Sequence, residues 1–287
     1  MSIQWFPGHM NRAKNAIFEQ LREIDIVIEL LDCRAPFSSC NPLLQSMTKY
    51  KKVIKLLNKS DLANPDTTKA WSTYFQSKNN SVLLGNKNDK AQRSRIIKAC
   101  RALMPNRNSF EKPLRVMIIG IPNVGKSTLI NQLINKKSAK TGDIPAVTKA
   151  IQRLTIEDNF LIYDTPGMMW QKIAYNEIGY NLALCNSIGR NALDEETLAI
   201  YLVSYLKQAY PNEFKARYKL EDDNLNLKDQ ELLKLIGKKR GCIVQGGVVD
   251  LQKVSEIIIQ DFRDGKIGQI SLESPKMWEE FFKNNLV

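Results

Sequence analysis

The chain has 287 residues, long enough for one large domain or two smaller ones. Its hydrophobic fraction of 43% and charged fraction of 25% are typical of a globular protein, and it contains no apolar run that would span a membrane. The net charge of +12 is uneven: counting gives +13 for residues 1–177 and −1 for residues 178–287. This excess favours a polyanionic partner such as nucleic acid for the first part, because neutralising phosphates releases counterions.

The cysteines and the N-terminus indicate a cellular compartment. Five widely spaced cysteines, with no CxxC pair, are typical of reduced thiols rather than of a disulfide framework or a zinc site. Residues 1–15 lack the apolar core of a secretory signal. The sequence therefore predicts a cytoplasmic protein.

Residues 1–177 alternate between short apolar runs and polar segments with helical periodicity. Runs of Val, Ile and Leu that end at loops are typical of parallel strands covered on both faces. Predicted strands are residues 24–32, 51–58, 81–85, 114–120, 151–156 and 160–167. Predicted helices are residues 10–22, 42–50, 67–76, 91–103 and 126–134. The alternation predicts a three-layer α/β domain with a mostly parallel sheet.

The pattern changes after this region. Helical periodicity without strand alternation occurs in residues 196–210, 229–241 and 250–268. The sequence thus predicts a first domain of residues 1–177 and a second, all-α domain of residues 178–287.

The motif NKSD, residues 58–61, follows the second predicted strand. A carboxylate at Asp61 accepts from both guanine N1–H and the exocyclic amine, whereas adenine offers neither donor. We expect Asn58 to contact the other edge of the base and the Lys59 stem to lie over its ring. A bare NKxD also occurs in turns that close a strand, so this interpretation depends on the phosphate-binding motifs that follow.

The segment GIPNVGKS, residues 120–127, matches the phosphate-binding loop GxxxxGK[ST] between a predicted strand and a predicted helix. Its glycines let backbone N–H groups approach the phosphates, and the helix N-terminus adds its positive dipole end. Lys126 is predicted to reach the β and γ phosphates, and the Ser127 hydroxyl to bind Mg²⁺. The predicted nucleotide-binding residues here are Asn123, Val124, Gly125, Lys126, Ser127 and Thr128.

DTPG, residues 164–167, ends the last predicted strand. Asp164 is placed to hold Mg²⁺ through water, and the Gly167 N–H to sense the γ-phosphate. Thr148 lies between the two phosphate motifs, which makes it the predicted switch threonine over Mg²⁺. Many small GTPases place a water-orienting Gln after DxxG, but here that residue is Met168, whose thioether cannot orient water by strong hydrogen bonds.

The order of the motifs is unusual, because NKSD precedes the phosphate loop. Relinking the nearby ends of a compact domain preserves its site while it relocates the termini. The order NKSD, GIPNVGKS, DTPG resembles a circularly permuted GTPase. Three further segments, WFPGHM (5–10), LDCRAPFSSCNP (31–42) and DFRDGKIGQISLE (261–273), resemble the YlqF/RbgA family of ribosome-biogenesis GTPases. The resemblance extends over nearly the whole chain.

This resemblance implies a circularly permuted P-loop GTPase domain followed by a small all-α domain. It implies GTP hydrolysis coupled to late assembly of the large (50S) ribosomal subunit, with rRNA and the subunit precursor as partners. We expect a monomer with no membrane contact. The alternative left open is a GTP-dependent binding switch for a protein partner, with incidental hydrolysis. A P-loop kinase or ATPase is disfavoured by NKSD.

The resemblance also implies roles for particular residues. His9, the only histidine, matches the FPGHM histidine that acts in hydrolysis, and joins Lys126 and Thr148 as a predicted catalytic residue. Asn123 resembles the asparagine that helps hold K⁺ in related GTPases. Asn86 and Lys87 occupy a base-contacting loop in which the family tends to read Asn-Ser. The family usually has Gly where this chain has Ala146, and Ala where it has Cys33.

Overall fold

A computed structural model describes residues 9–78, 80–107, 109, 111–134, 150–157, 159–170, 172–189 and 193–285. Within these ranges, no helix is both long enough and apolar enough to cross a membrane. All five cysteines lie within them and are free, as their spacing predicts.

One six-stranded sheet organises the first part of the chain. Its strands are β1 (Ile26–Asp32), β2 (Lys52–Asn58), β3 (Ser81–Leu84), β4 (Leu114–Ile119), β5 (Gln152–Glu157) and β6 (Phe160–Asp164). Their order across the sheet is β3-β2-β1-β4-β6-β5. Neighbours pair in parallel except β5, which runs antiparallel to β6. The mostly parallel sheet is therefore confirmed. Strand β5 differs from the predicted parallel strands covered on both faces: it lies at the edge of the sheet, and its side chains are exposed or half-buried.

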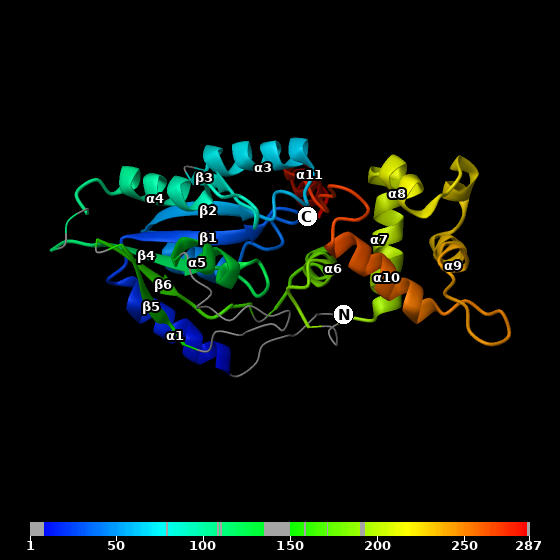
Figure 1. The fold of residues 1–287 in the computed structure, drawn as a ribbon, viewed down its shortest axis with the longest axis horizontal. Helices are drawn as coiled ribbons and strands as arrows, with labels where there is room; N and C mark the ends of the chain where they lie inside the picture. The colour runs from blue at the N-terminus through cyan, green and yellow to red at the C-terminus, as the bar shows by residue number, and fades with distance from the viewer. Residues whose placement is uncertain are drawn as a thin grey trace.

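Helices cover both faces of the sheet, as the alternation of helix and strand predicts. They are α1 (His9–Leu21), α2 (Pro42–Thr48), α3 (Pro65–Ser77), α4 (Gln92–Leu103) and α5 (Lys126–Ile134). Ile17, Leu21 and Leu44 of α1 and α2 form one cluster, while the apolar residues of α3, α4 and α5 belong to the other. Figure 1 shows α3 and α4 on one side of the sheet and α1 on the other. The three-layer architecture is confirmed.

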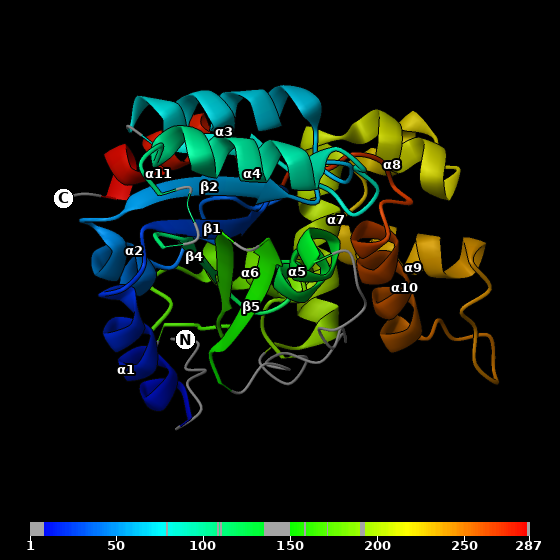
Figure 2. The same cartoon turned by 60° about the vertical axis from the view of Figure 1, so that its left-hand side comes forward.

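The rest of the described chain is almost entirely helical. Its elements are α6 (Asn176–Leu184), α7 (Glu195–Ala209), α8 (Pro211–Tyr218), the 3-10 helix η2 (Asp222–Asn226), α9 (Asp229–Lys239), α10 (Leu251–Arg263) and α11 (Pro275–Asn285). Helices α7 to α10 pack together beside the sheet, and α11 returns to pack against α3 (Figure 2).

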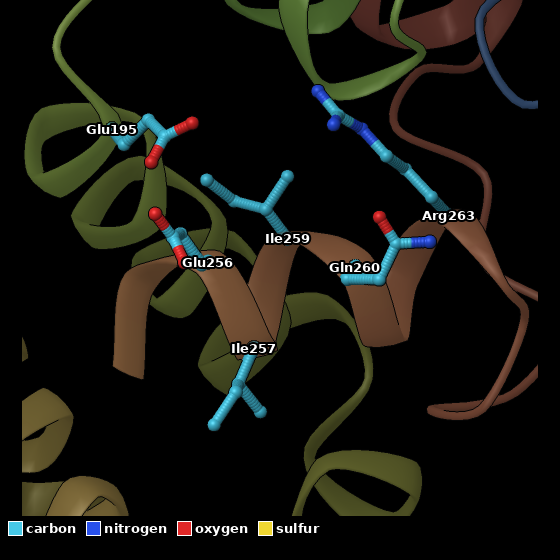
Figure 3. A pocket seen from close by; sticks show the side chains of 6 residues that line it. All are labelled: Glu195, Glu256, Ile257, Ile259, Gln260 and Arg263. Carbon is cyan, nitrogen blue, oxygen red and sulfur yellow. The ribbon is translucent and has the colours of Figure 1, made fainter. Parts of the chain in front are cut away.

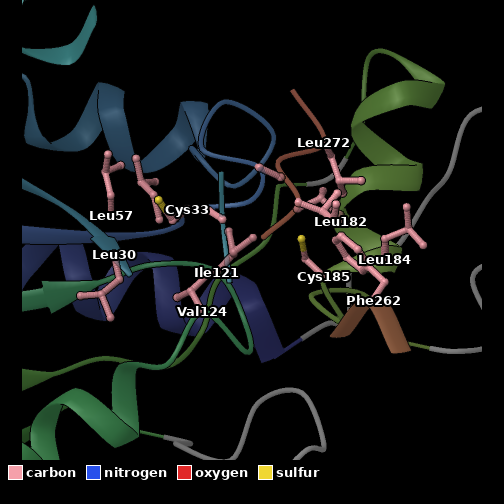
Figure 4. Packing of buried hydrophobic residues seen from close by; sticks show 14 of the residues in the cluster. Leu30, Cys33, Leu57, Ile121, Val124, Leu182, Leu184, Cys185, Phe262 and Leu272 are labelled. Atoms are coloured by element: carbon pink, nitrogen blue, oxygen red, sulfur yellow. The ribbon is translucent and has the colours of Figure 1, made fainter. Parts of the chain in front are cut away.

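The larger hydrophobic cluster continues from the sheet into this helical part. In Figure 4 the cluster extends from Leu30 of β1, past Ile121 and Val124 of the loop after β4, to Leu182 of α6 and Phe262 of α10. All five side chains are buried. Because the core is continuous across residue 177, the division of the chain at that residue stays a prediction.

Candidate nucleotide-binding site

The predicted motifs meet at one edge of the sheet. Parallel strands present their carboxyl ends at the same edge, which is where ligands bind in sheets of this kind. Here β2 ends in Asn58 of NKSD, β4 leads into the phosphate loop, and β6 ends in Asp164 of DTPG. The three motifs are far apart in the chain, and the order of the strands in the sheet brings them together.

The phosphate loop closes around the Lys126 side chain. The Lys126 Nζ donates to the carbonyl oxygens of Gly120 and Ile121, at 3.0 Å each. The residue is only 8% exposed, and this burial lowers the pKa of Lys126 to about 8, against the opposing effect of Asp164. Ser127 and Thr128 follow at the start of α5 and are half-buried. The Lys126 ammonium group is thus held against the backbone of the phosphate loop.

Asn58 joins the NKSD motif to the phosphate loop. Its Nδ2 donates to the Val124 carbonyl oxygen at 2.7 Å. Gly125 lies against the same amide: its φ is +100°, and a Cβ there would lie 2.3 Å from Asn58 Nδ2. Glycine is therefore required at this position for both backbone and space. The contact from Asn58 to the loop was not predicted from the sequence, which assigned Asn58 only to the base.

Lys59 is fixed at both ends. Its backbone is left-handed, with a φ of +58°. Its Nζ donates to Asp32 Oδ2 and to the Asn123 carbonyl oxygen, at 2.8 Å each. The side chain between these anchors is 23% exposed. The aliphatic stem of Lys59 is therefore ordered and partly exposed to solvent.

Asp32 and Arg34, in the LDCR segment, were quoted in the resemblance but not predicted as site residues. Asp32 is fully buried and accepts from Arg34 Nε at 3.0 Å and Nη2 at 2.9 Å. Burial would raise the pKa of Asp32, but Arg34 and Lys59 outweigh it and hold that pKa well below its usual range. The available signal in the sequence was an acidic residue at the end of a buried strand with a basic residue two positions later.

The loop after β3 lies beside NKSD. The backbone N and the Oγ of Ser60 both donate to the Gly85 carbonyl oxygen, at 3.0 and 3.1 Å. Gln132 of α5 donates to the carbonyl oxygen of Lys87 at 2.8 Å and more weakly to that of Asn86. The Ser60 bonds hold this loop beside NKSD, and the Gln132 bonds connect Asn86 and Lys87 to α5.

DTPG packs against the phosphate loop. A Cβ on Gly167 would lie 3.1 Å from Pro122 and 3.2 Å from Lys126 Nζ, so the two loops approach closely. The Met168 N donates to the Gly120 carbonyl oxygen at 3.3 Å, and the Met168 side chain is fully buried. Asp164 is also buried. A buried thioether agrees with the expectation that Met168 does not orient the attacking water.

Asn123 connects the phosphate loop to the helical part. Its φ is +59°, and its Nδ2 donates to the Asn186 carbonyl oxygen at 2.7 Å, just beyond the end of α6. The structure does not place two other predicted site residues. Thr148 lies outside the described residues, and the described side chains do not include that of His9, the first residue of α1. Ala146, where the family usually has Gly, also lies outside the described residues.

A separate pocket of about 260 Å³ lies between α7 and α10. Figure 3 shows Glu195 and Glu256 near one another and Arg263 at the other end. The Arg263 Nε donates to the Leu184 carbonyl oxygen and its Nη2 to that of Ala183, at 3.0 and 2.8 Å. None of the lining residues belongs to the predicted nucleotide site, and we assign the pocket no part in it.

A phosphate loop, DTPG and NKSD gathered at one edge of a parallel sheet define a GTP-binding P-loop protein. It is circularly permuted, because β2 with NKSD precedes β4 and the phosphate loop in the chain. Residues 115–244 match the family model described as 50S ribosome-binding GTPase, and residues 40–174 match that of RsgA GTPase.

Whole-chain relatives define the family. Ribosome biogenesis GTPase A of Bacillus cereus is 38% identical over 98% of this chain and 96% of its own length. The protein of that name from Bacillus licheniformis is 40% identical over 96% of this chain and 99% of its own. The crystal structure of GNP-bound YlqF from T. maritima covers 92% of this chain and 99% of that one, at 27% identity and a TM-score of 0.65. The chain belongs to the ribosome biogenesis GTPase A family, YlqF/RbgA, and is a GTPase.

Proposed function

We propose that this GTPase assists late maturation of the large ribosomal subunit, and that it binds rRNA in the subunit precursor in a GTP-dependent way. The observation that carries the proposal is the 38% identity over 98% of the chain to ribosome biogenesis GTPase A of Bacillus cereus. The net charge of +12 supports it, because a basic protein gains affinity for RNA by releasing counterions. We place this activity in the cytoplasm and in a monomer.

The two parts of the chain have different roles in this function. Residues 1–177 form the permuted GTP-binding domain and carry the basic excess that favours RNA, and residues 178–287 add further contacts to RNA or the pre-ribosome. The contact from Asn123 to Asn186 supports communication between them, because it joins the phosphate loop directly to the end of α6.

We propose Mg²⁺ as a cofactor, held by Ser127, Asp164 and Thr148. A hydroxyl and a carboxylate are the oxygen ligands that Mg²⁺ prefers, and the buried Asp164 lies close enough to Lys126 to interact electrostatically with it. When bound, the ion would neutralise charge on the phosphates. The resemblance of Asn123 to the asparagine that helps hold K⁺ in related GTPases is the basis of a second proposal, K⁺ at this residue.

We assign His9 to hydrolysis, as the residue that acts on the attacking water or the developing charge. Replacing His9 by alanine should lower the hydrolysis rate by about a hundredfold, a typical loss for a general acid or base. The dissociation constant for GTP should change much less. Single-turnover hydrolysis and equilibrium binding separate the two effects. An unchanged single-turnover rate would remove His9 from the mechanism.

We assign guanine recognition to Asp61, with Asn58, Lys59, Asn86 and Lys87 around it. Among the described residues no hydrogen bond engages the half-buried Asp61 carboxylate, which leaves its oxygens available to the base.

Replacing Asp61 by asparagine should shift the preference from GTP toward XTP by about a hundredfold, because an amide matches xanthine better and loses a charge-assisted pair with guanine. Competition between the two nucleotides measures this shift. Asp66→Asn, an exposed residue of α3, is the matched control and should keep the preference for GTP. An unchanged preference in Asp61→Asn would contradict the assignment.

Co-sedimentation with large-subunit precursors tests the proposed function, with a GTP analogue and with GDP. We expect binding with the analogue and release with GDP, and precursor particles should raise GTP turnover well above its basal rate. Binding without stimulated turnover would favour the alternative, a GTP-dependent switch for a protein partner. No binding in either state would contradict the proposal.

A further inference from the structure

We propose that Asp32 is a positioning residue for guanine binding: it holds the Lys59 side chain in the place where the base stacks on it. This inference rests on the proposed guanine site and adds a residue that the motifs do not contain. Its basis is the ion pair between Lys59 Nζ and Asp32 Oδ2, at 2.8 Å, across two neighbouring strand ends.

Lysine is a poor stacking surface unless its side chain is ordered. A free lysine has many rotamers, and fixing them on binding costs free energy. Here the backbone of Lys59 is held in the left-handed region and its ammonium has two acceptors, Asp32 Oδ2 and the Asn123 carbonyl oxygen. The ordering cost is therefore met before the nucleotide arrives, which raises affinity by preorganisation.

Asp32 is itself held independently of Lys59. It accepts from the backbone N of Arg34 at 3.1 Å as well as from the Arg34 guanidinium, and its own N donates to Ser39 Oγ at 3.0 Å. Arg34 is 2% exposed and lies over the Phe262 ring, with its Cζ 5.0 Å from the ring centroid. The bidentate arginine already balances the carboxylate, so Lys59 is not needed to neutralise it. The second cation on the same oxygen is instead positioned by it.

The competing explanation is that Asp32 acts only in folding, as the buried partner of Arg34. A purely structural ion pair predicts that substitution lowers stability but leaves the affinity of the folded protein for GDP unchanged. The positioning role predicts a loss of affinity that depends on the presence of Lys59. A double-mutant cycle separates the two explanations, because it measures the coupling between the two side chains.

The experiment measures the dissociation constant for GDP in full-length Asp32→Asn, Lys59→Met and the double variant, by calorimetry well below the unfolding temperature. We expect each single substitution to raise the constant about tenfold, as for the loss of a hydrogen bond to a charged group. The double variant should be no weaker than Lys59→Met alone. Additive losses, or a GDP affinity unchanged in Asp32→Asn, overturn the proposal.

Asp25→Asn is the matched control. Asp25 precedes the same strand β1 at its opposite end, and its largely buried carboxylate also faces an arginine, Arg107, at 3.3 Å. We expect this substitution to lower the unfolding temperature without changing GDP affinity. If it weakens GDP binding as much as Asp32→Asn does, the effect of Asp32 is one of general stability and the proposal fails.

Two further outcomes are informative. If Lys59→Met binds GDP as tightly as the wild type, the proposed base site itself is wrong; if only Asp32→Asn is without effect, this inference alone fails. Where Asp32→Asn does not fold, Asp32→Glu replaces it, because it keeps a negative charge beside Arg34 but moves it by one methylene. A folded Asp32→Glu protein with unchanged GDP affinity contradicts the proposal.

Discussion

Replacing Lys126 by alanine is expected to abolish binding of GTP and GDP, with a rise of more than about a hundredfold in both dissociation constants. The Lys126 ammonium is buried within the phosphate loop, where it donates to the carbonyl oxygens of Gly120 and Ile121. No other lysine or arginine in the described part of the loop supplies that charge. Phosphates bound there without Lys126 would lose their central charge-assisted hydrogen bonds.

Equilibrium binding of a fluorescent GDP analogue measures this loss. Lys98→Ala is the matched control, because Lys98 is exposed on α4 and alanine suits a helix. The control should bind the nucleotide as the wild type does. Circular dichroism should show that Lys126→Ala is folded. Tight nucleotide binding in folded Lys126→Ala would mean that the phosphates bind elsewhere, which would contradict the assignment of residues 120–127 as the phosphate site.

The parts of this site that the sequence predicts are local in the chain. The phosphate loop, DTPG and NKSD are each defined within a few residues, and each follows a buried apolar strand whose pattern is equally local. All six predicted strands are present for that reason. Their spatial order also explains the reversed motif order, because relocating the termini leaves the carboxyl edge of the sheet intact.

The parts that the sequence does not predict depend on contacts between distant residues. Helix α11 was not predicted, although Trp278, Phe281 and Phe282 recur at helical spacing. Its place in the fold depends on distant residues: the ring centroids of Phe37 and Tyr175 lie 4.3 and 6.5 Å from that of Trp278. The pairing of Asp32 with Lys59 likewise follows from the register of β1 and β2. A pairing between two strands is not visible in the periodicity of either one.

Glu273 is the clearest of these distant contacts, and its replacement by alanine should have the largest effect on stability. Its buried carboxylate accepts from the backbone N of Phe37 and Ser38, from Ser38 Oγ, from Asn181 Nδ2 and from Trp278 Nε1. Burial raises the pKa of Glu273, although these donors favour the ionised form. The side chain therefore joins the loop after β1 to α6 and α11.

Removing this carboxylate would leave several buried donors without an acceptor, each at a cost of about 1–3 kcal/mol. We expect Glu273→Ala to lower the free energy of unfolding by about 3 kcal/mol or more, and the melting temperature by about 6–12 °C. Glu273→Gln should lose less, because it keeps one oxygen, but its amide N–H₂ would face donors. Glu279→Ala, on the exposed side of α11, is the control and should change stability by no more than about 0.5 kcal/mol.

The loss at Glu273 should also extend to the helical part of the chain. The neighbouring Leu272 N donates to the Arg34 carbonyl oxygen at 2.8 Å, so release of this segment loosens the loop that carries Arg34. Hydrogen exchange should then increase in residues 33–40 and in α11 together, while the backbone of the phosphate loop stays protected by GDP. A melting temperature within about 1 °C of the wild type would contradict the prediction, since buried donors left without an acceptor cannot be neutral.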